Sequence, residues 1–175
     1  MNTSVLPATQ LQIRTLISQA GELNVHLIEG EVPVPTSNEV LIRIEAVPVN
    51  PSDVGRLLSA VKIDSLRSVE GAPFPAVQGE LPQSVLPSLA ARLDKALPAG
   101  NEGAGVVVAA GDSPEAQALL GRTVAIFSGK MYQQYCTARA VDCLVLAEGT
   151  SPADAASSTV NPMTALGMVE TMRAE

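Results

Sequence analysis

The chain of 175 residues is long enough for one domain, or for one domain with a connecting element. Hydrophobic residues make up 46% of it and aromatic residues only 2%, so its core must be built mainly from Val, Leu, Ile and Ala. The net charge of -7 and the lack of a basic patch argue against nucleic acid or an anionic membrane as the main partner. No apolar run approaches the roughly 20 residues of a membrane span.

The cysteine usage indicates a reducing compartment. The only two cysteines, Cys136 and Cys143, both lie in strand-like sequence. We expect two buried thiols rather than a disulfide or a metal site. The first eight residues also lack the charged start and apolar segment of a secretory signal. These features together predict a cytoplasmic protein.

The N-terminal part predicts a β-hairpin. Residues 11–17 and 23–28 alternate apolar and mixed positions, and residues 19–22 supply a turn between them. His26, the only histidine, shares a strand face with Asn24. We expect His26 to face solvent.

A strand, an elbow and a short helix are expected next. Residues 39–47 show the clearest alternation of the chain. Pro51 disfavours a helical conformation at Asn50 but suits an early helical position, so a helix is expected from Pro51 or Ser52 to Leu58. The Asn50 amide then lies in the elbow, where it either binds a ligand or caps its own backbone.

Residues 59–82 contain several prolines and glycines and are expected to be irregular. Leucines at helical spacing predict a helix over residues 84–96 with one packing face. Pro87 is tolerable there only in the first turn. These leucines are Leu86, Leu89, Leu93 and Leu97.

Residues 98–111 combine a glycine-rich turn with a buried strand. The order G-x-x-G-x-G followed by a strand differs from the strand, G-x-G-x-x-G and helix of a dinucleotide fingerprint. A tight turn feeding a strand is therefore favoured over a phosphate cradle. Glu102 lies at the start of this strand, and a carboxylate there needs a hydrogen-bonding partner.

The remaining segments are short. A helical segment is expected over residues 113–120, strands over 121–127, 131–138 and 143–146, and helix starts at 151–154 and at 161–162. Many short strands with few helices predict a mainly β domain, similar to a β-barrel, that ends in a helix.

Six segments in this order resemble the N-terminal catalytic domain of the medium-chain dehydrogenase/reductase superfamily, and most closely its zinc-independent quinone oxidoreductase and enoyl reductase branch. The segments are residues 39–44, 49–53, 100–107, 121–124, 132–135 and 161–165. The resemblance implies a GroES-like, partly open β-barrel with short peripheral helices and a C-terminal linker helix. Residues 1–160 would form this catalytic domain. Residues 161–175 would begin the helix that leads to a Rossmann NADPH-binding domain, which is missing from this chain.

The sequence departs from the zinc-dependent members of that superfamily. Their cysteine and histidine ligands are replaced by Asn50 or Ser52 and by Asn101, so no metal is expected. Some enoyl reductases carry a tyrosine acid about ten residues after the Asn-Pro motif, where this chain has residues 59–62 without a tyrosine. No catalytic residue is therefore assigned. Residues 61–97 also exceed the usual length of that region in the family.

The resemblance implies an NADPH-dependent oxidoreductase that reduces quinones or α,β-unsaturated carbonyls by hydride transfer. Asn50 and Thr164 would lie near the nicotinamide, and Asn161 would shape the crossing between the domains. The chain alone would be inactive, because one wall of the site is absent. Exposed apolar residues of the terminal helix, including Leu166 and Met168, would favour a homodimer of the fragment as an artefact. The alternative is a non-catalytic GroES-like interaction or scaffold domain.

Overall fold

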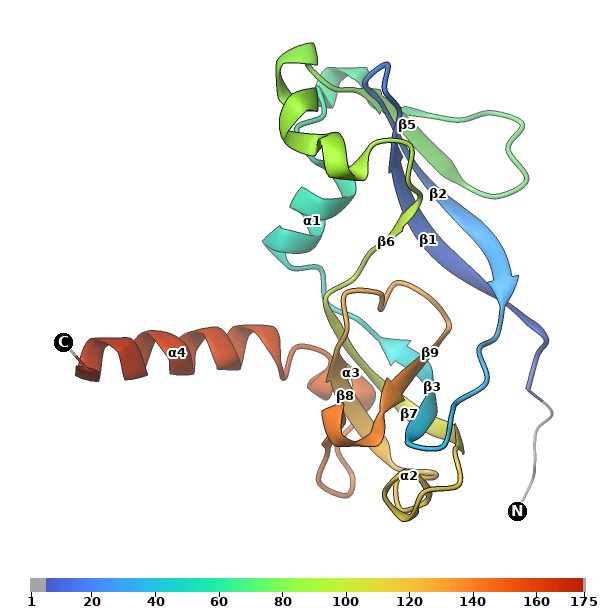
Figure 1. Cartoon of the computed structure of the whole chain (residues 1–175), viewed down its shortest axis with the longest axis vertical. Coiled ribbons are helices and arrows are strands. Elements are labelled where there is room, and N and C mark those ends of the chain that lie inside the picture. The colour runs from blue at the N-terminus through green and yellow to red at the C-terminus, as the bar shows by residue number, and fades with distance from the viewer. Residues whose placement is uncertain (1–5, 175) are drawn as a thin grey trace. The chain divides into compact units, whose positions relative to one another are not determined.

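The computed structural model describes residues 6–174, which fall into two compact units. Of these described residues, unit 1 contains 6–31 and Val49–Ala99, and unit 2 contains Val32–Pro48 and 100–174. Each unit is built on one open antiparallel sheet (Figure 1). Among residues 6–174, no helix combines the length and the apolar character that a bilayer crossing requires.

The sheet of unit 1 confirms the predicted hairpin and extends it. β1 and β2 pair in register from Thr9↔Glu31 to Ile17↔Leu23, and Gly21 takes a φ of +85° in the turn between them. His26 and Asn24 share one face, but His26 is only partly exposed and its Nδ1 atom is buried, so the expectation of a solvent-facing ring is wrong. The strand order is β4-β5-β2-β1-β6, with β1 at Thr9–Ile17, β2 at Glu22–Glu31, β4 at Arg67–Ser68, β5 at Ala76–Glu80 and β6 at Leu97–Pro98.

The helices of unit 1 include one confirmed prediction and two corrections. α1 spans Pro51–Leu58 as expected. The region expected to be irregular instead contains η1 (Ile63–Ser65) and strands β4 and β5, because β5 finds a partner in β2. The helix expected over residues 84–96 is a 3-10 helix, η2 (Gln83–Arg92), with Pro87 inside it. The tighter turns and the proline shorten it, and Leu97 lies in β6.

The core of unit 1 explains the leucine pattern. Leu86 is buried, and Leu89 and Leu93 pack against the same cluster, so these three leucines face the core. The buried members of that cluster are Ile17, Leu23, Val61, Leu81 and Leu86.

Strand β7, which follows the glycine-rich turn, is the central strand of the sheet of unit 2. Gly105 lies so close to β3 that an added Cβ would come within 2.0 Å of the Arg43 carbonyl oxygen. Gly100 has a φ of +91°, and Tyr132 fills the space next to it. The glycines thus serve a tight turn and close strand packing. The order is β10-β8-β7-β3-β9, with β3 at Glu39–Ala46, β7 at Glu102–Ala110, β8 at Thr123–Phe127, β9 at Tyr135–Arg139 and β10 at Leu144–Val145.

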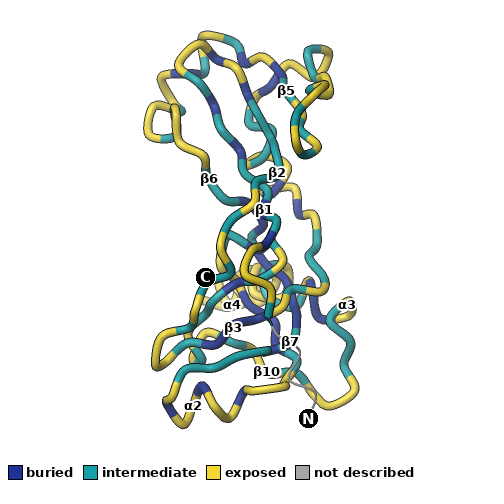
Figure 2. Tube along the Cα trace, turned by 90° about the vertical axis from the view of Figure 1, so that its right-hand side faces the viewer, coloured by how far each residue is buried: buried dark blue, intermediate teal, exposed yellow. Residues whose placement is uncertain are grey.

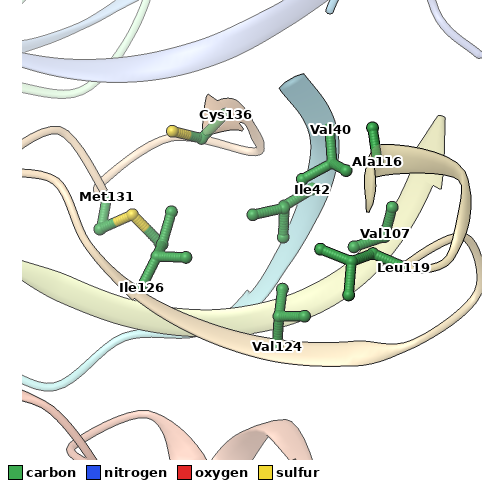
Figure 3. Packing of buried hydrophobic residues seen from close by; sticks show 9 residues of the cluster. All are labelled: Val40, Ile42, Val107, Ala116, Leu119, Val124, Ile126, Met131 and Cys136. Atoms are coloured by element: carbon green, nitrogen blue, oxygen red, sulfur yellow. The ribbon is translucent and has the colours of Figure 1, made fainter. Parts of the chain in front are cut away.

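The core of unit 2 is aliphatic, as the composition predicts. Side chains from β3, β7 and β8 meet α2 (Pro114–Gln117) and the residues after it (Figure 3). Figure 2 shows the buried stretches of β3 and β7. The buried members are Val40, Ile42, Val107, Ala116, Leu119, Val124, Ile126, Met131 and Cys136.

Two further helices follow this sheet, after the 3-10 turn η3 (Ala140–Asp142). α3 spans Pro152–Ala155 and α4 spans Val160–Ala174, which confirms both predicted helix starts to within a residue. The strands expected over 131–138 and 143–146 are shorter than predicted. The mainly β architecture with short helices and a terminal helix is confirmed, and both sheets stay open at their edges. The domain boundary expected at residue 160 remains a prediction.

Candidate functional site

Glu102 joins the sheet of unit 2 to the start of α4. Its side chain is buried, and its Oε2 atom accepts hydrogen bonds from the Thr159 backbone N (2.9 Å), the Thr159 hydroxyl (2.6 Å) and the Val160 backbone N (2.8 Å). The first N–H groups of a helix have no partner within the helix, and its positive dipole end favours a carboxylate. The buried carboxylate therefore has the partners that the sequence required.

Small side chains hold the segment before α4 against the sheet. Ala155 of α3 is buried with Ala104 of β7 and Ala125 of β8, where larger side chains would keep the helix away from the strands. Ser151 caps α3, since its hydroxyl oxygen accepts from the Asp154 backbone N at 3.2 Å. As a result, α3 and Glu102 together determine where α4 begins.

α4 carries two of the three residues that the resemblance implies for cofactor binding. Asn161 and Thr164 are both exposed, and their i, i+3 spacing places them on one side of the helix. The Thr164 hydroxyl donates to the Val160 carbonyl oxygen at 2.7 Å. Its oxygen can still accept a hydrogen bond.

The rest of α4 is unusually apolar for an exposed helix. None of its described residues is buried, and Figure 1 shows it running away from the sheet of unit 2. The large apolar side chains exposed on it are Met163, Leu166, Met168, Val169 and Met172. An exposed apolar surface of this kind marks a site of interaction. The homodimer that the sequence suggested remains a prediction.

Asn50, the third implied residue, belongs to unit 1. It lies at the N-cap of α1, 5% exposed, and its backbone N donates to Asp53 Oδ2 at 3.0 Å. The Asp53 backbone N in turn donates to the Asn50 carbonyl oxygen at 2.9 Å. The elbow therefore has the geometry of a helix cap, which was one of the two alternatives for Asn50. The structure brings Asn161 and Thr164 together on one helix and leaves Asn50 in the other unit.

Thr159 is the residue that sequence reasoning missed at this site. It was not singled out, although it directly precedes a helix and threonine is favoured at that position. Its backbone and hydroxyl both bind the Glu102 carboxylate. What sequence could not supply was the partner, which lies 57 residues earlier in the chain.

Both thiols are free, and Cys136 is buried as expected, whereas Cys143 is only partly buried, so the expectation of two buried thiols is confirmed for Cys136 alone. Burial raises the pKa of the Cys136 thiol, and burial raises the pKa of Cys143 to about 11. Such thiols hold little thiolate near neutral pH and make poor nucleophiles or metal ligands. Within the described part of the chain, no three His, Cys, Asp or Glu side chains gather where a metal ion could bind.

The glycine-rich turn offers no phosphate cradle. Gly103 and Gly105 face neighbouring backbone, where an added Cβ would lie 2.9 Å and 2.0 Å from a carbonyl oxygen, so their missing side chains are filled by β3 and the residue after it. The strand that follows is the central strand β7 and not a helix. The glycine-rich turn therefore does not have the geometry of a phosphate-binding loop before a helix.

No protein-family model matches the sequence. The fold, however, is shared with solved reductases. A protein from Mesorhizobium loti assigned as an NADPH:quinone reductase is 23% identical, with a TM-score of 0.66 over 98% of this chain and 46% of its own. A mycobacterial protein solved with NADPH is 20% identical, with a TM-score of 0.60 over 91% of this chain and 39% of its own. The CurK enoyl reductase is 18% identical, with a TM-score of 0.60 over 91% and 41%.

These similarities confirm the fold that the sequence resemblance implied. At such identities they concern the fold alone. The chain also spans less than half the length of each of these three structures.

Proposed function

We propose that this chain is the substrate-side domain of a medium-chain oxidoreductase that uses NADPH to reduce quinones or α,β-unsaturated carbonyls without zinc. The observation that carries the proposal is the shared fold, which covers 91% or more of this chain in three proteins, of which two bear reductase names and one was solved with NADPH. The six sequence segments that resemble this branch also support it.

The cofactor would be bound mostly by a second domain, following α4, that this chain does not contain. NADPH supplies a hydride when bound, and a quinone or enone is electron-poor enough to accept it without a metal. In this proposal, Asn161 and Thr164 orient the nicotinamide from α4. The Thr164 hydroxyl donates its proton in a hydrogen bond to the Val160 carbonyl oxygen, so its own oxygen is the acceptor that would receive an amide N–H. Asn50, at the N-cap of α1, would also contact the nicotinamide ring.

The Glu102 interaction gives this arrangement its rigidity. α4 has no buried residue of its own, so its direction depends on the bonds at its first turn. A helix that carries cofactor contacts must be held closely, because small displacements of reacting groups reduce rate strongly. Glu102 is thus a positioning residue in this proposal.

The test is NADPH oxidation by the product of the complete gene with a quinone and with an enal. We expect turnover that survives dialysis against a chelator, and none from residues 1–175 alone. Thr164→Val should raise KM for NADPH about fivefold or more, which corresponds to the loss of one hydrogen bond. Thr171→Val is the matched control, because the Thr171 hydroxyl makes the same kind of bond, to the Gly167 carbonyl oxygen at 2.9 Å.

Two outcomes would contradict the proposal. One is a complete gene that encodes no dinucleotide-binding domain after residue 175, which would favour the interaction-domain alternative. The other is a full-length protein that oxidises no NADPH with either substrate class. Activity lost on chelation would overturn the zinc-independent part alone.

A further inference from the structure

Two polar atoms on β2 are shielded from solvent and lack partners. Within residues 6–174, neither Asn24 Oδ1 nor His26 Nδ1 has a hydrogen-bond partner. Most buried polar side-chain atoms in proteins do have one, and an unpartnered atom costs about 1–3 kcal/mol. Two such atoms two residues apart on one strand face call for an explanation.

Neighbouring side chains on the sheet do not supply the missing partners. Arg14 lies directly opposite His26 on β1, but its guanidinium donates to the Gln12 side-chain oxygen. Gln78 of β5 lies opposite Asn24, and Asn24 Oδ1 still has no partner among the described residues. Among the described residues, these two atoms therefore have no hydrogen-bond donor on this face of the sheet.

Both residues line an open cavity of about 420 Å³ between β2 and the β4–β5 connection, residues 69–75. Figure 1 shows this connection in green next to β5. Ile28, Pro73 and Phe74 contribute apolar walls. Cavities of a few hundred Å³ that are mostly apolar, with a few polar groups, are typical of small-molecule sites.

The chemistry of the walls selects the ligand. Asn24 Oδ1 only accepts hydrogen bonds, and Nδ1 of a neutral imidazole accepts when the proton is on Nε2. A ligand must therefore bring a donor. Glu29 also lines the cavity. Its carboxylate accepts from the Thr9 hydroxyl at 2.6 Å, and its negative charge disfavours an anion nearby. The apolar walls suit a flat ring.

We propose that unit 1 carries a binding site for a small uncharged aromatic molecule with one hydrogen-bond donor, of the phenol type, between β2 and residues 69–75. The donor of the ligand pairs with Asn24 Oδ1 or His26 Nδ1, and the ring packs on Phe74. Because both atoms are shielded, the side chains around them must shift to admit the donor. Gly71, with a φ of +74°, lies within this connection. The inference rests on unit 1 alone and does not depend on the proposed oxidoreductase function.

The only histidine of the chain supplies an unambiguous probe. We would titrate the full 175-residue chain with phenol and with anisole, which lacks the donor, and follow the imidazole signals of His26 by NMR. Phenol should bind saturably with a Kd on the order of 1 mM. Anisole should bind about fivefold more weakly, because one hydrogen bond is lost. Equal affinity for both probes, or the absence of saturation, would overturn the proposal.

Two variants sharpen the test. Asn24→Leu should reduce the preference for phenol over anisole to about twofold or less, since one of the two acceptors is gone. Phe74→Ala should weaken the binding of both probes about tenfold, because the ligand ring loses its packing surface. Phe127→Ala is the matched control, since Phe127 is the only other phenylalanine and lies exposed on β8 of unit 2. Weakening by Phe127→Ala to the same degree as by Phe74→Ala would contradict the site.

Discussion

Each unit holds shielded polar side-chain atoms near its sheet, and two sets of these atoms differ in their hydrogen bonding. In unit 2, the deepest carboxylate, that of Glu102, receives three hydrogen bonds at one oxygen atom. In unit 1, Asn24 Oδ1 and His26 Nδ1 are shielded and have no partner among residues 6–174. A fully paired buried group fixes one structure, whereas an unpaired one lowers stability and leaves binding capacity unused. The contrast supports the positioning role that we propose for Glu102 and the ligand that we propose for unit 1.

The hydrophobic core of unit 2 is also larger than that of unit 1. Among the described residues, the cluster of unit 2 has nine buried members, on four neighbouring strands, the α2 region and the β8–β9 connection. The cluster of unit 1 has five, one of which lies on a 3-10 helix. A side chain surrounded on all sides loses more contacts when it is truncated than one at the edge of a smaller cluster. We therefore expect unit 2 to be the more stable unit.

The largest effect should come from truncating the two cores. Ile42→Ala in unit 2, where Ile42 is fully buried, should lower the free energy of unfolding by about 4 kcal/mol. Leu86→Ala in unit 1 should cost about 2 kcal/mol, because η2 can collapse onto the space. Urea unfolding with residue-resolved amide exchange measures both. Val141→Ala, at a residue 78% exposed, is the control and should change stability by less than about 0.5 kcal/mol. Equal costs for the two core variants would break the comparison.

The next effect concerns Glu102. Glu102→Ala should cost about 3 kcal/mol, because three donors at the start of α4 lose their acceptor, and Glu102→Gln should cost about half as much. Amide exchange at Thr159 and Val160 should accelerate in both variants, since these N–H groups are bonded to the carboxylate. Glu115→Gln, at an exposed position in the first turn of α2, should have little effect. Unchanged exchange at Thr159 in Glu102→Ala would show that α4 is held by other contacts.

A smaller effect is expected for thiol reactivity. A pKa raised to about 11 at Cys143 reduces its thiolate fraction about a hundredfold relative to an ordinary thiol. A more basic thiolate is a stronger nucleophile, which offsets up to about tenfold of this loss in reaction rate. Both thiols should therefore react with a disulfide reagent at pH 8 at least about tenfold more slowly in the folded chain than in urea. A thiol that reacts equally fast in both states would contradict the described burial.

The smallest effect involves a turn of unit 2. The Glu39 carboxylate accepts hydrogen bonds from the Thr36 hydroxyl (2.7 Å) and backbone N (2.9 Å), which lowers its pKa. A lowered pKa in the folded state contributes stability above the unfolded pKa and loses it as the pH falls through the folded one. Thr36→Ala should thus cost less than about 1 kcal/mol at pH 7, since the pair is exposed. The cost should shrink below about pH 4, as thermal unfolding at both pH values would show. A cost that does not depend on pH would remove the carboxylate from the explanation.

Local patterns were sufficient for most elements of the fold. The hairpin of β1 and β2, strands β3 and β7, and helices α1 and α4 follow from alternation, turn residues and capping signals near each segment. Strand β5 did not follow, because its sequence has weak alternation and it forms by pairing with β2. The length of η2 also escaped prediction, since the leucine spacing suits a packing face in either kind of helix.

The features of the candidate sites also divide into those that local sequence predicts and those that only tertiary contacts decide. Sequence alone determined that the chain has an aliphatic core, that its glycine-rich turn feeds a strand, and that a carboxylate at the start of that strand needs a partner, because each depends on residue chemistry and close neighbours. Tertiary structure alone decided that the partner is Thr159, that His26 is shielded, and that Asn24 and His26 border one cavity with Phe74. Those facts depend on contacts between segments far apart in the chain, which no local pattern encodes.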